Sequence, residues 1–342
     1  MKEDLLITQN NMKSYPEIVH SLKDKHILVT GGAGFIGSTI TEALLNLGAS
    51  VTVLDDLSTG LQSNIDRLSH FEKYRFVEAD ICQPENYRHL LKEIDAVSHQ
   101  AALGSVPRSI EFPLNTHRVN ATGFLTFLHE IKEAGIKRFV YASSSSVYGD
   151  ATAAIKKEGE EGKALSPYAV TKQLNEQYAG VYATLHAIET IGLRYFNVFG
   201  PHQNPNGVYA AAIPKFLDAV MNGGKIVVNG DGEQTRDFTY VQNAVLANLL
   251  ALSTVNQSAF GKVFNVACGK KLSLNEVITG IINGVEANKH QPKHVLEFGP
   301  KRAGDIPHSL AAIDQIQKEL NYFVLYSFEE GLAAYLAHSI HD

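Results

Sequence analysis

A glycine-rich turn between a short apolar run and an amphipathic stretch constrains the fold more than any other feature of the chain. The run 26–30 (HILVT) suits a buried strand, and the periodicity of 38–47 is helical. Gly31, Gly34 and Gly37 lie between them at intervals of three. A strand–turn–helix unit of this kind presents backbone N–H groups at a helix start, where phosphates bind. We therefore predict an α/β fold, a Rossmann-type doubly wound parallel sheet that binds a dinucleotide.

The three glycines have different expected roles. Gly31 permits the tight turn, Gly34 allows the backbone to approach a pyrophosphate, and Gly37 allows the helix to pack closely on the strand. The spacing is Gly-x-x-Gly-x-x-Gly rather than Gly-x-Gly-x-x-Gly. A glycine turn with a purely structural role is the alternative.

Two carboxylates follow the second expected strand, 50–54. Asp55 is placed to accept hydrogen bonds from ribose hydroxyls, and its charge would repel a 2′-phosphate. We therefore predict NAD rather than NADP as the cofactor. The alternative for Asp56 is a turn residue that faces solvent.

Further strands are expected at 74–79, 94–99 and 138–142. The first ends at Asp80, in a position suited to the adenine edge. The second ends in the small-residue loop 100–104, which could lie against the cofactor. The third delivers a serine run at its carboxyl end, where ligands bind in such folds.

A helix start precedes the pair Tyr168 and Lys172. Ser166 can cap free backbone N–H groups, and Pro167 suits the first turn. The tyrosine and the lysine then lie one turn apart on one face, and the ammonium group should lower the phenol pKa. The pair can supply a general base, and the hydroxyls of the serine run 143–146 upstream could relay a proton. An ordinary surface pair is the alternative.

The C-terminal part of the chain departs from the regular alternation after a strand at 188–194. Helices are expected at 241–252, 273–285, 314–320 and 327–338, with strands at 226–229 and 263–267. The earlier segments 15–22 and 109–135 are expected to be a short helix and mostly one long helix. We predict an N-terminal extension over 1–24, a nucleotide-binding domain over 25–200 that also receives 239–268, and an interleaved substrate lobe over 201–342.

Composition excludes several classes of protein. A net charge of −6 argues against a nucleic-acid-binding surface as the main function. The two cysteines are distant in sequence, and the 14 histidines are scattered, so no metal site is expected. No apolar run has the length of a membrane span or of a signal peptide. The sequence therefore predicts a cytoplasmic protein without a membrane partner.

Several motifs occur together and in order, and together they carry a family resemblance. They are the glycine turn, Asp55, Tyr148-Gly149 after the serines, Tyr168-x-x-x-Lys172 and the run 193–197 (LRYFN). The chain resembles the extended short-chain dehydrogenase/reductase superfamily from about residue 15 onward. Within it, the segments 100–109 (QAALGSVPRS), 165–172 (LSPYAVTK), 191–200 (IGLRYFNVFG) and 229–238 (NGDGEQTRDF) are similar to UDP-N-acetylglucosamine 4-epimerases of bacterial surface-polysaccharide pathways.

The resemblance implies roles for named residues. Ser144, Tyr168 and Lys172 match the catalytic residues. The implied NAD contacts are Gly31, Gly34, Phe35, Ile36, Gly37, Asp55, Asp56, Ser58, Thr59, Gly60, Asp80, Ile81, Gln100, Ala101, Ala102, Tyr168, Lys172 and Tyr195. The implied contacts to a UDP-sugar are Gly104, Ser105, Arg108, Ser144, Ser145, Tyr168, Asn197, Ala211, Lys215, Val228, Asn229, Arg236, Arg302, Asp305 and Ser309. A homodimer through helices such as 109–135 and 168–185 is also implied.

The resemblance further indicates the reaction. Related dehydratases and decarboxylases carry an acidic residue just before Tyr-Gly, whereas 144–147 (SSSV) has none, which favours C4 epimerisation through a transient 4-keto sugar. The small Ser309 leaves room for a 2-acetamido group, so UDP-GlcNAc/UDP-GalNAc interconversion is predicted. Epimerisation of UDP-GlcNAcA or UDP-Glc/UDP-Gal, a net NAD-dependent dehydrogenase and a non-catalytic NAD-binding regulator are the alternatives.

Overall fold

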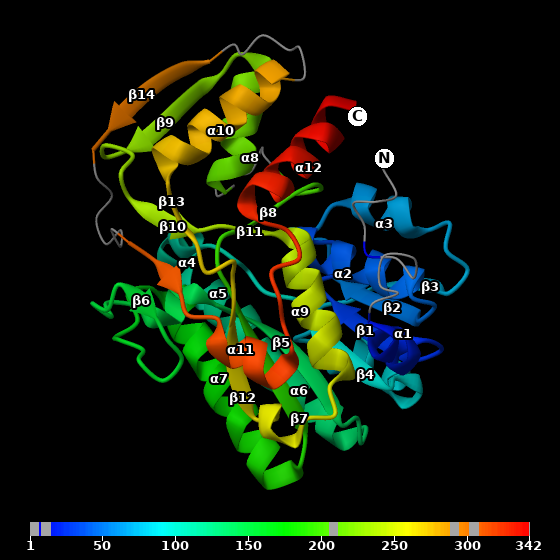
Figure 1. Ribbon diagram of the computed structural model, residues 1–342. Helices are drawn as coiled ribbons and strands as arrows, with labels where there is room; N and C mark the ends of the chain where they lie inside the picture. Colours follow the sequence, from blue (N-terminus) through cyan, green and yellow to red (C-terminus); the bar gives the residue numbers. More distant parts are fainter. Residues whose placement is uncertain (1–6, 8–14, 205–210, 288–293, 301–307, 342) are drawn as a thin grey trace.

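A seven-stranded sheet forms the centre of the computed structural model, which describes residues 7, 15–204, 211–287, 294–300 and 308–341 (Figure 1). Its strand order is β12-β7-β5-β4-β1-β2-β3, and every neighbouring pair is parallel. The strands are β1 (His26–Thr30), β2 (Ser50–Asp55), β3 (Tyr74–Glu78), β4 (Ala96–His99), β5 (Arg138–Ser144), β7 (Glu189–Tyr195) and β12 (Lys262–Val266). The predicted Rossmann-type sheet is thus confirmed.

Helices cover both faces of this sheet, because its strands are apolar on both sides. On one face, Val140 of β5 packs in a cluster with α1 (Pro16–Leu22), α2 (Phe35–Asn46), α3 (Gln62–Leu68), α9 (Val241–Ser253) and α11 (Asp314–Leu320). On the other face, Phe139 and Tyr141 of the same strand pack with α6 (Phe124–Glu133) and α7 (Pro167–His186). The alternation along β5 therefore divides the core into two layers.

A smaller lobe lies above the carboxyl ends of the strands in Figure 1. In it, α8 (Ala212–Asn222), α10 (Leu274–Ala287), α12 (Phe328–His341) and β9 (Lys225–Asn229) share a core of their own, and β14 (Val295–Gly299) pairs in parallel with β9. Short strand pairs link the parts: β6 (Ile155–Lys156) with β15 (Leu310–Ala311), β8 (Val198–Phe199) with β11 (Thr239–Tyr240), and β10 (Thr235–Asp237) with β13 (Lys271–Ser273). The domain boundaries at 24 and 200 stay a prediction.

The segment 109–135, expected to be mostly one long helix, is interrupted at Phe112 and is then helical without a break from Pro113 to Glu133. It is divided among α4 (Val106–Glu111), α5 (Pro113–His117), a π-helical turn (Arg118–Gly123) and α6. Phe112 precedes a proline and has φ −126° and ψ 63°, because the proline ring disfavours the helical conformation at the preceding residue. The remaining short turns are 3-10 helices at Pro84–Asn86, Arg88–Glu93, Ser145–Tyr148 and Gln257–Ala259.

Within the described part of the chain, no helix combines the length and the apolarity that a bilayer span requires.

Candidate active site

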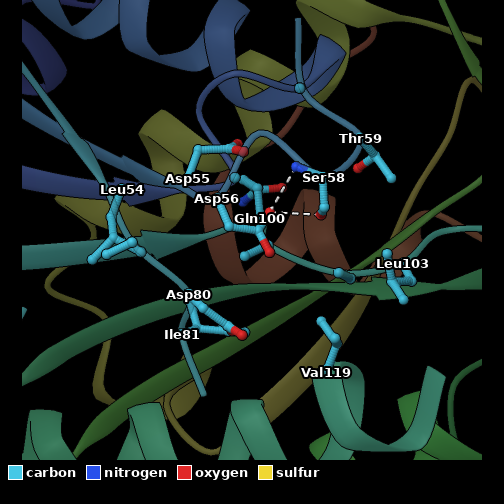
Figure 2. Close-up of a pocket in the computed structure, with 15 residues that line it drawn as sticks. Leu54, Asp55, Asp56, Ser58, Thr59, Asp80, Ile81, Gln100, Leu103 and Val119 are labelled. Carbon is cyan, nitrogen blue, oxygen red and sulfur yellow. Dashed lines mark hydrogen bonds between the residues drawn. The ribbon is translucent and has the colours of Figure 1, made fainter. Parts of the chain in front are cut away.

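A cleft lies at the carboxyl ends of four adjacent strands, β3, β2, β1 and β4. Figure 2 shows Asp55, Asp80 and Gln100 lining it from three different strand ends. Its lining contains eleven of the predicted cofactor contacts: Gly31, Gly34, Asp55, Asp56, Ser58, Thr59, Asp80, Ile81, Gln100, Ala101 and Ala102. The structure therefore brings together residues from loops that are far apart in sequence.

The glycine turn fits the backbone of a dinucleotide. Gly31 has φ +69°, and a Cβ there would lie 2.6 Å from the backbone nitrogen of Ala101. A Cβ at Gly37 would lie 2.2 Å from the carbonyl oxygen of Gly31, so only glycine lets α2 start this close to the turn. No side chain caps the start of α2 at Phe35 and Ile36, which leaves its first N–H groups to bind phosphate.

The two carboxylates after β2 differ in environment. Asp55 is buried, and its oxygens accept hydrogen bonds from the N–H groups of Ala33 at 3.0 Å and Leu57 at 2.9 Å. Burial raises the pKa of its carboxyl group above the ordinary value. Asp56 is exposed and accepts bonds from the backbone and hydroxyl of Ser58. Asp56 thus has the geometry of a turn residue that faces solvent, which was its alternative role. Asp55 fits the predicted ribose contact.

The floor of the cleft is held by polar contacts. Asp80 accepts a bond from the N–H of Cys82 and pairs with Arg118 at 3.0 Å. Burial would raise its pKa, but these partners lower it below the ordinary value. At Gly60, a Cβ would lie 2.6 Å from that of Ala33, so the loop packs tightly against the glycine turn.

The candidate catalytic residues meet beside this cleft. Ser144 ends β5, and α7 begins as predicted: Ser166 accepts a bond from the N–H of Ala169 at 3.1 Å, and Pro167 occupies the first turn. Lys172 Nζ lies 5.9 Å from the centre of the Tyr168 ring.

The electrostatics of the tyrosine differ from the expectation. Burial raises the pKa of Tyr168, and a hydrogen bond with Ser144 acts in the opposite direction. Burial also lowers the pKa of Lys172 to about 8, although the charge of Glu176 opposes this. Lys172 Nζ donates to the carbonyl oxygen of Ala142 at 2.8 Å. The expected lowering of the phenol pKa by the lysine is therefore not seen: desolvation raises the pKa of Tyr168, and the group that lowers it is Ser144.

A second pocket lies in the smaller lobe. Four of the predicted sugar-nucleotide contacts line it, namely Asn197, Lys215, Asn229 and Arg236. Sequence reasoning missed its apolar and amide walls, which are Ala212, Phe216, Val227, Gln234, Phe238 and Leu274. Alternation along β9 could have indicated Val227, because the predicted Val228 points into the lobe core and is fully buried. Ala211 is exposed directly before α8.

The other predicted substrate contacts that the structure describes do not line either cavity. Ser105 caps α4 by accepting a bond from the N–H of Arg108, and a Cβ on Gly104 would meet no atom within 4 Å. Ser145 begins the 3-10 turn after β5, and the N–H of Ser309 donates to the carbonyl oxygen of Thr235. Arg302 and Asp305 lie outside the described residues.

Comparison with known proteins identifies the family. The model of the NAD dependent epimerase/dehydratase family matches residues 27–267. The chain belongs to this family. The epimerase/dehydratase family member UDP-glucose 4-epimerase of Mycolicibacterium smegmatis is 34% identical over 309 residues, which are 90% of this chain and 96% of that protein.

Two solved structures of epimerases have the same architecture. Epimerase Mth375 of Methanothermobacter thermautotrophicus is 33% identical, with a TM-score of 0.88 and 95% of each chain covered. The UDP-N-acetylglucosamine 4-epimerase of Methanobrevibacter ruminantium M1, solved with UDP-N-acetylmuramic acid, is 37% identical with a TM-score of 0.84, covering 93% of this chain and 99% of that one. As in its family, NAD is the cofactor of this epimerase/dehydratase, and the residues of the first cleft fit it.

Proposed function

We propose that this protein catalyses C4 epimerisation of a UDP-hexose, with UDP-GlcNAc and UDP-GalNAc as the substrates. The observation that carries the proposal is the meeting of Ser144, Tyr168 and Lys172 at the strand ends beside the NAD cleft. The relatives named for UDP-glucose and UDP-N-acetylglucosamine 4-epimerisation support the reaction type.

The side chains of this protein would accept and donate the proton of the sugar C4 hydroxyl. Tyr168 accepts that proton, directly or through Ser144, as the sugar becomes a 4-keto compound. It returns the proton after the keto sugar has rotated to present its other face. NAD, when bound, supplies a hydride acceptor and a positively charged ring that favours the phenolate. Lys172 is held by the carbonyl oxygen of Ala142 and contributes its ammonium charge close to Tyr168.

Elimination or decarboxylation is disfavoured by the residues around the catalytic serine. The segment 144–147 contains three serines and a valine, so no carboxylate is available there for a further proton transfer. A net dehydrogenase stays the second candidate, and it differs in one observable property. It would release NADH, whereas an epimerase returns its hydride to the sugar.

The second pocket supports a nucleoside diphosphate. Arg236 and Lys215 can form charge-assisted hydrogen bonds with a diphosphate or a ribose, and the apolar wall at Phe216 can cover a base. Ser309 follows the bridge between His308 and Thr235 and is therefore adjacent to Arg236. Its small side chain is the reason for proposing an N-acetylated hexose rather than a plain one.

Incubation with UDP-GlcNAc, UDP-Glc and UDP-GlcNAcA in separate reactions tests the proposal. We expect chromatography to show UDP-GalNAc as the main product and no rise in NADH absorbance. Faster turnover of UDP-Glc or UDP-GlcNAcA would contradict the assigned sugar. Net formation of NADH with any of these would contradict epimerisation.

The variant Ser309→Tyr tests the size argument. A tyrosine at this position should fill the space for the 2-acetamido group, and a loss of about 1–3 kcal/mol in transition-state binding lowers kcat/KM for UDP-GlcNAc about 10- to 200-fold. Turnover of UDP-Glc by the same variant is the internal control. Unchanged turnover of the N-acetylated substrate would remove Ser309 from the specificity argument.

We also propose a homodimer through α5 and α7. Leu114, Val181 and Leu185 are 85%, 49% and 70% exposed on these helices, which is a large apolar surface for a single chain. Light scattering at micromolar concentration tests this, and a monomeric mass would contradict it.

A further inference from the structure

Helix α9 packs across β4, β5 and β7 on one face of the sheet and is almost entirely buried. Every residue from Val241 to Leu252 is buried, and Asn248 has 0% exposure. A buried amide in a helix that is otherwise largely apolar is costly unless each of its polar atoms has a partner. The partners of Asn248 therefore indicate why an amide is present here.

All polar atoms of Asn248 are engaged, and three of its partners belong to the ends of sheet strands. Its Oδ1 accepts bonds from Ser98 Oγ at 3.1 Å and Gln100 Nε2 at 3.2 Å. Its Nδ2 donates to the hydroxyl of Tyr195 at 2.7 Å and to the carbonyl oxygen of Ala244 at 2.8 Å. The Tyr195 hydroxyl in turn donates to Gln100 Oε1 at 3.0 Å, which closes a ring of side chains.

The ring has one arrangement of donors and acceptors. Because burial raises the pKa of Tyr195, its hydroxyl keeps its proton. That hydroxyl accepts from Asn248 and donates to Gln100, so turning either amide by 180° would place two donors or two acceptors together. The network therefore fixes the rotamer of Gln100 as well as its position.

This ring joins two strands that are not neighbours. Ser98 and Gln100 lie on and directly after β4, Tyr195 ends β7, and β5 with Ser144 runs between them. Gln100 lines the NAD cleft, yet its side-chain amide is occupied by Ser98, Asn248 and Tyr195. Gln100 therefore shapes the cleft through its backbone, which lies against the glycine turn. A Cβ on Gly31 would be 2.8 Å from the Gln100 carbonyl carbon.

We propose that Asn248 is a positioning residue for the cofactor, which aligns the loop after β4 with the end of β7 so that both face NAD in one geometry. It does not touch the cleft and acts through Gln100 and Tyr195. The inference depends on the cleft and not on which sugar is turned over.

Helix α9 offers a matched control for the test. Asn243 is equally buried, but its Oδ1 accepts from the N–H groups of Leu325 and Tyr326, so it holds the C-terminal segment instead of the cleft. Asn248→Ala and Asn243→Ala each leave buried groups unpaired, and both should lower the melting temperature.

Only Asn248→Ala should weaken NAD binding. Titration of the cofactor-free protein, by calorimetry or NADH fluorescence, is expected to show a Kd about tenfold higher than wild type, since one to two hydrogen bonds of positioning are lost. The Kd of Asn243→Ala should stay within about twofold. Equal effects of the two variants on Kd, or an unchanged Kd in Asn248→Ala, would overturn the proposal.

A double variant tests whether Asn248 acts through the phenol. Tyr195→Phe removes the hydroxyl between the two amides, so the effects of Asn248→Ala and Tyr195→Phe on NAD affinity should be clearly less than additive. Additive effects would show that Asn248 acts independently of Tyr195 and would overturn the route through the ring.

Discussion

At the scale of single residues, the charge of Lys172, the proposed catalytic lysine, depends on its neighbours. Lys172 is buried, and Glu176 is the carboxylate that opposes its desolvation. Arg194 binds Glu176 through both oxygens, at 2.8 Å and 2.7 Å, and Ser143 also donates to it. Ser143 and Arg194 pair in register one residue before Ser144 and Tyr195, so Glu176 joins α7 to the two strand ends at the site.

Removing this charge should change the pH dependence of catalysis. In Glu176→Gln the ammonium form of Lys172 loses its stabilising neighbour, so the lysine pKa falls below about 8. Because the lysine loses its proton as pH rises through its pKa, the alkaline limb of the pH–kcat/KM profile should move to lower pH. Other titratable groups near the lysine are His99, whose pKa burial lowers to about 3, and Tyr168.

Glu130→Gln is the matched control for this profile. Glu130 lies on α6, away from the lysine, and forms a bidentate ion pair with Arg88 at 2.5 and 2.7 Å. Breaking it should alter stability and leave the alkaline limb in place. If the pH profile of Glu176→Gln is identical to that of wild type, the charge of Glu176 does not influence the pKa of Lys172.

The proposed base gives the sharpest effect on rate. Tyr168→Phe keeps the ring and removes the hydroxyl, so kcat should fall about 10²- to 10⁴-fold, the usual contribution of a general acid–base group. NAD titration should show nearly unchanged affinity, since the backbone turn and the strand ends still form the cleft. Epimerisation at more than about a tenth of the wild-type rate would assign the proton transfer elsewhere.

At the scale of elements, the glycine turn and α2 depend on each other. The start of α2 lies so close to the turn that a Cβ on Gly37 would be 2.2 Å from Gly31 O and 2.9 Å from the Cα of Gly32. Such a contact has to be relieved by moving the helix away from the strand.

Gly37→Ala should therefore reduce both stability and NAD binding. Overpacking of this kind costs about 1–3 kcal/mol, which a lower melting temperature and a weaker NAD titration would report. Gly180→Ala is the control, because Gly180 lies inside α7 with open space around its Cβ position. There alanine should raise stability by about 0.5–1 kcal/mol. Equal stability of wild type and Gly37→Ala would contradict the packing argument.

Local sequence patterns predicted the elements well where one physical rule governed them. The strand–glycine–helix unit and the Ser166-Pro167 helix start were predicted because caps and turns are short-range features. The segment 109–135 was predicted as mostly one long helix because its periodicity is helical; the break at Phe112, before Pro113, was not predicted. Asn248 was missed because periodicity treats α9 as uniformly apolar; an amide in such a run is itself a signal that a distant partner exists.

At the scale of the whole molecule, the NAD cleft and the pocket proposed for the UDP-sugar lie over different hydrophobic cores. The NAD cleft lies on the sheet, and the second pocket lies on α8, β9 and β10. Asp237 of β10 links the smaller lobe to the sheet: its carboxylate accepts bonds from the N–H groups of Cys268, just after β12, and of Ala311 in β15, and its carbonyl oxygen accepts from Asn197 of the second pocket. A sequence pattern could predict residues of each region, but not this connection, which depends on how distant segments fold together.

The two regions should respond separately to mutation. Arg236→Gln removes a charge from the second pocket, so the KM for the UDP-sugar should rise about 10- to 100-fold, the value of a charged hydrogen bond of about 1.5–3 kcal/mol. The NAD Kd should be unchanged.

Lys225→Gln is the control for charge alone. Lys225 lies on β9 in the same lobe, is 67% exposed and pairs with Glu297. Its loss should leave both KM and Kd near wild type. A weakened NAD affinity in Arg236→Gln would show that the two regions are not separable.

The ring of side chains around Asn248 also has a consequence for the stage of folding at which the protein can bind its cofactor. Ser98 and Asn248 are 150 residues apart in the chain, and the strand ends they join have a third strand between them. The ring of side chains therefore exists only in a chain whose β4, β7 and α9 have come together. Because a ligand that binds only the folded form stabilises it, NAD will favour molecules whose assembly is complete over those still lacking part of the sheet.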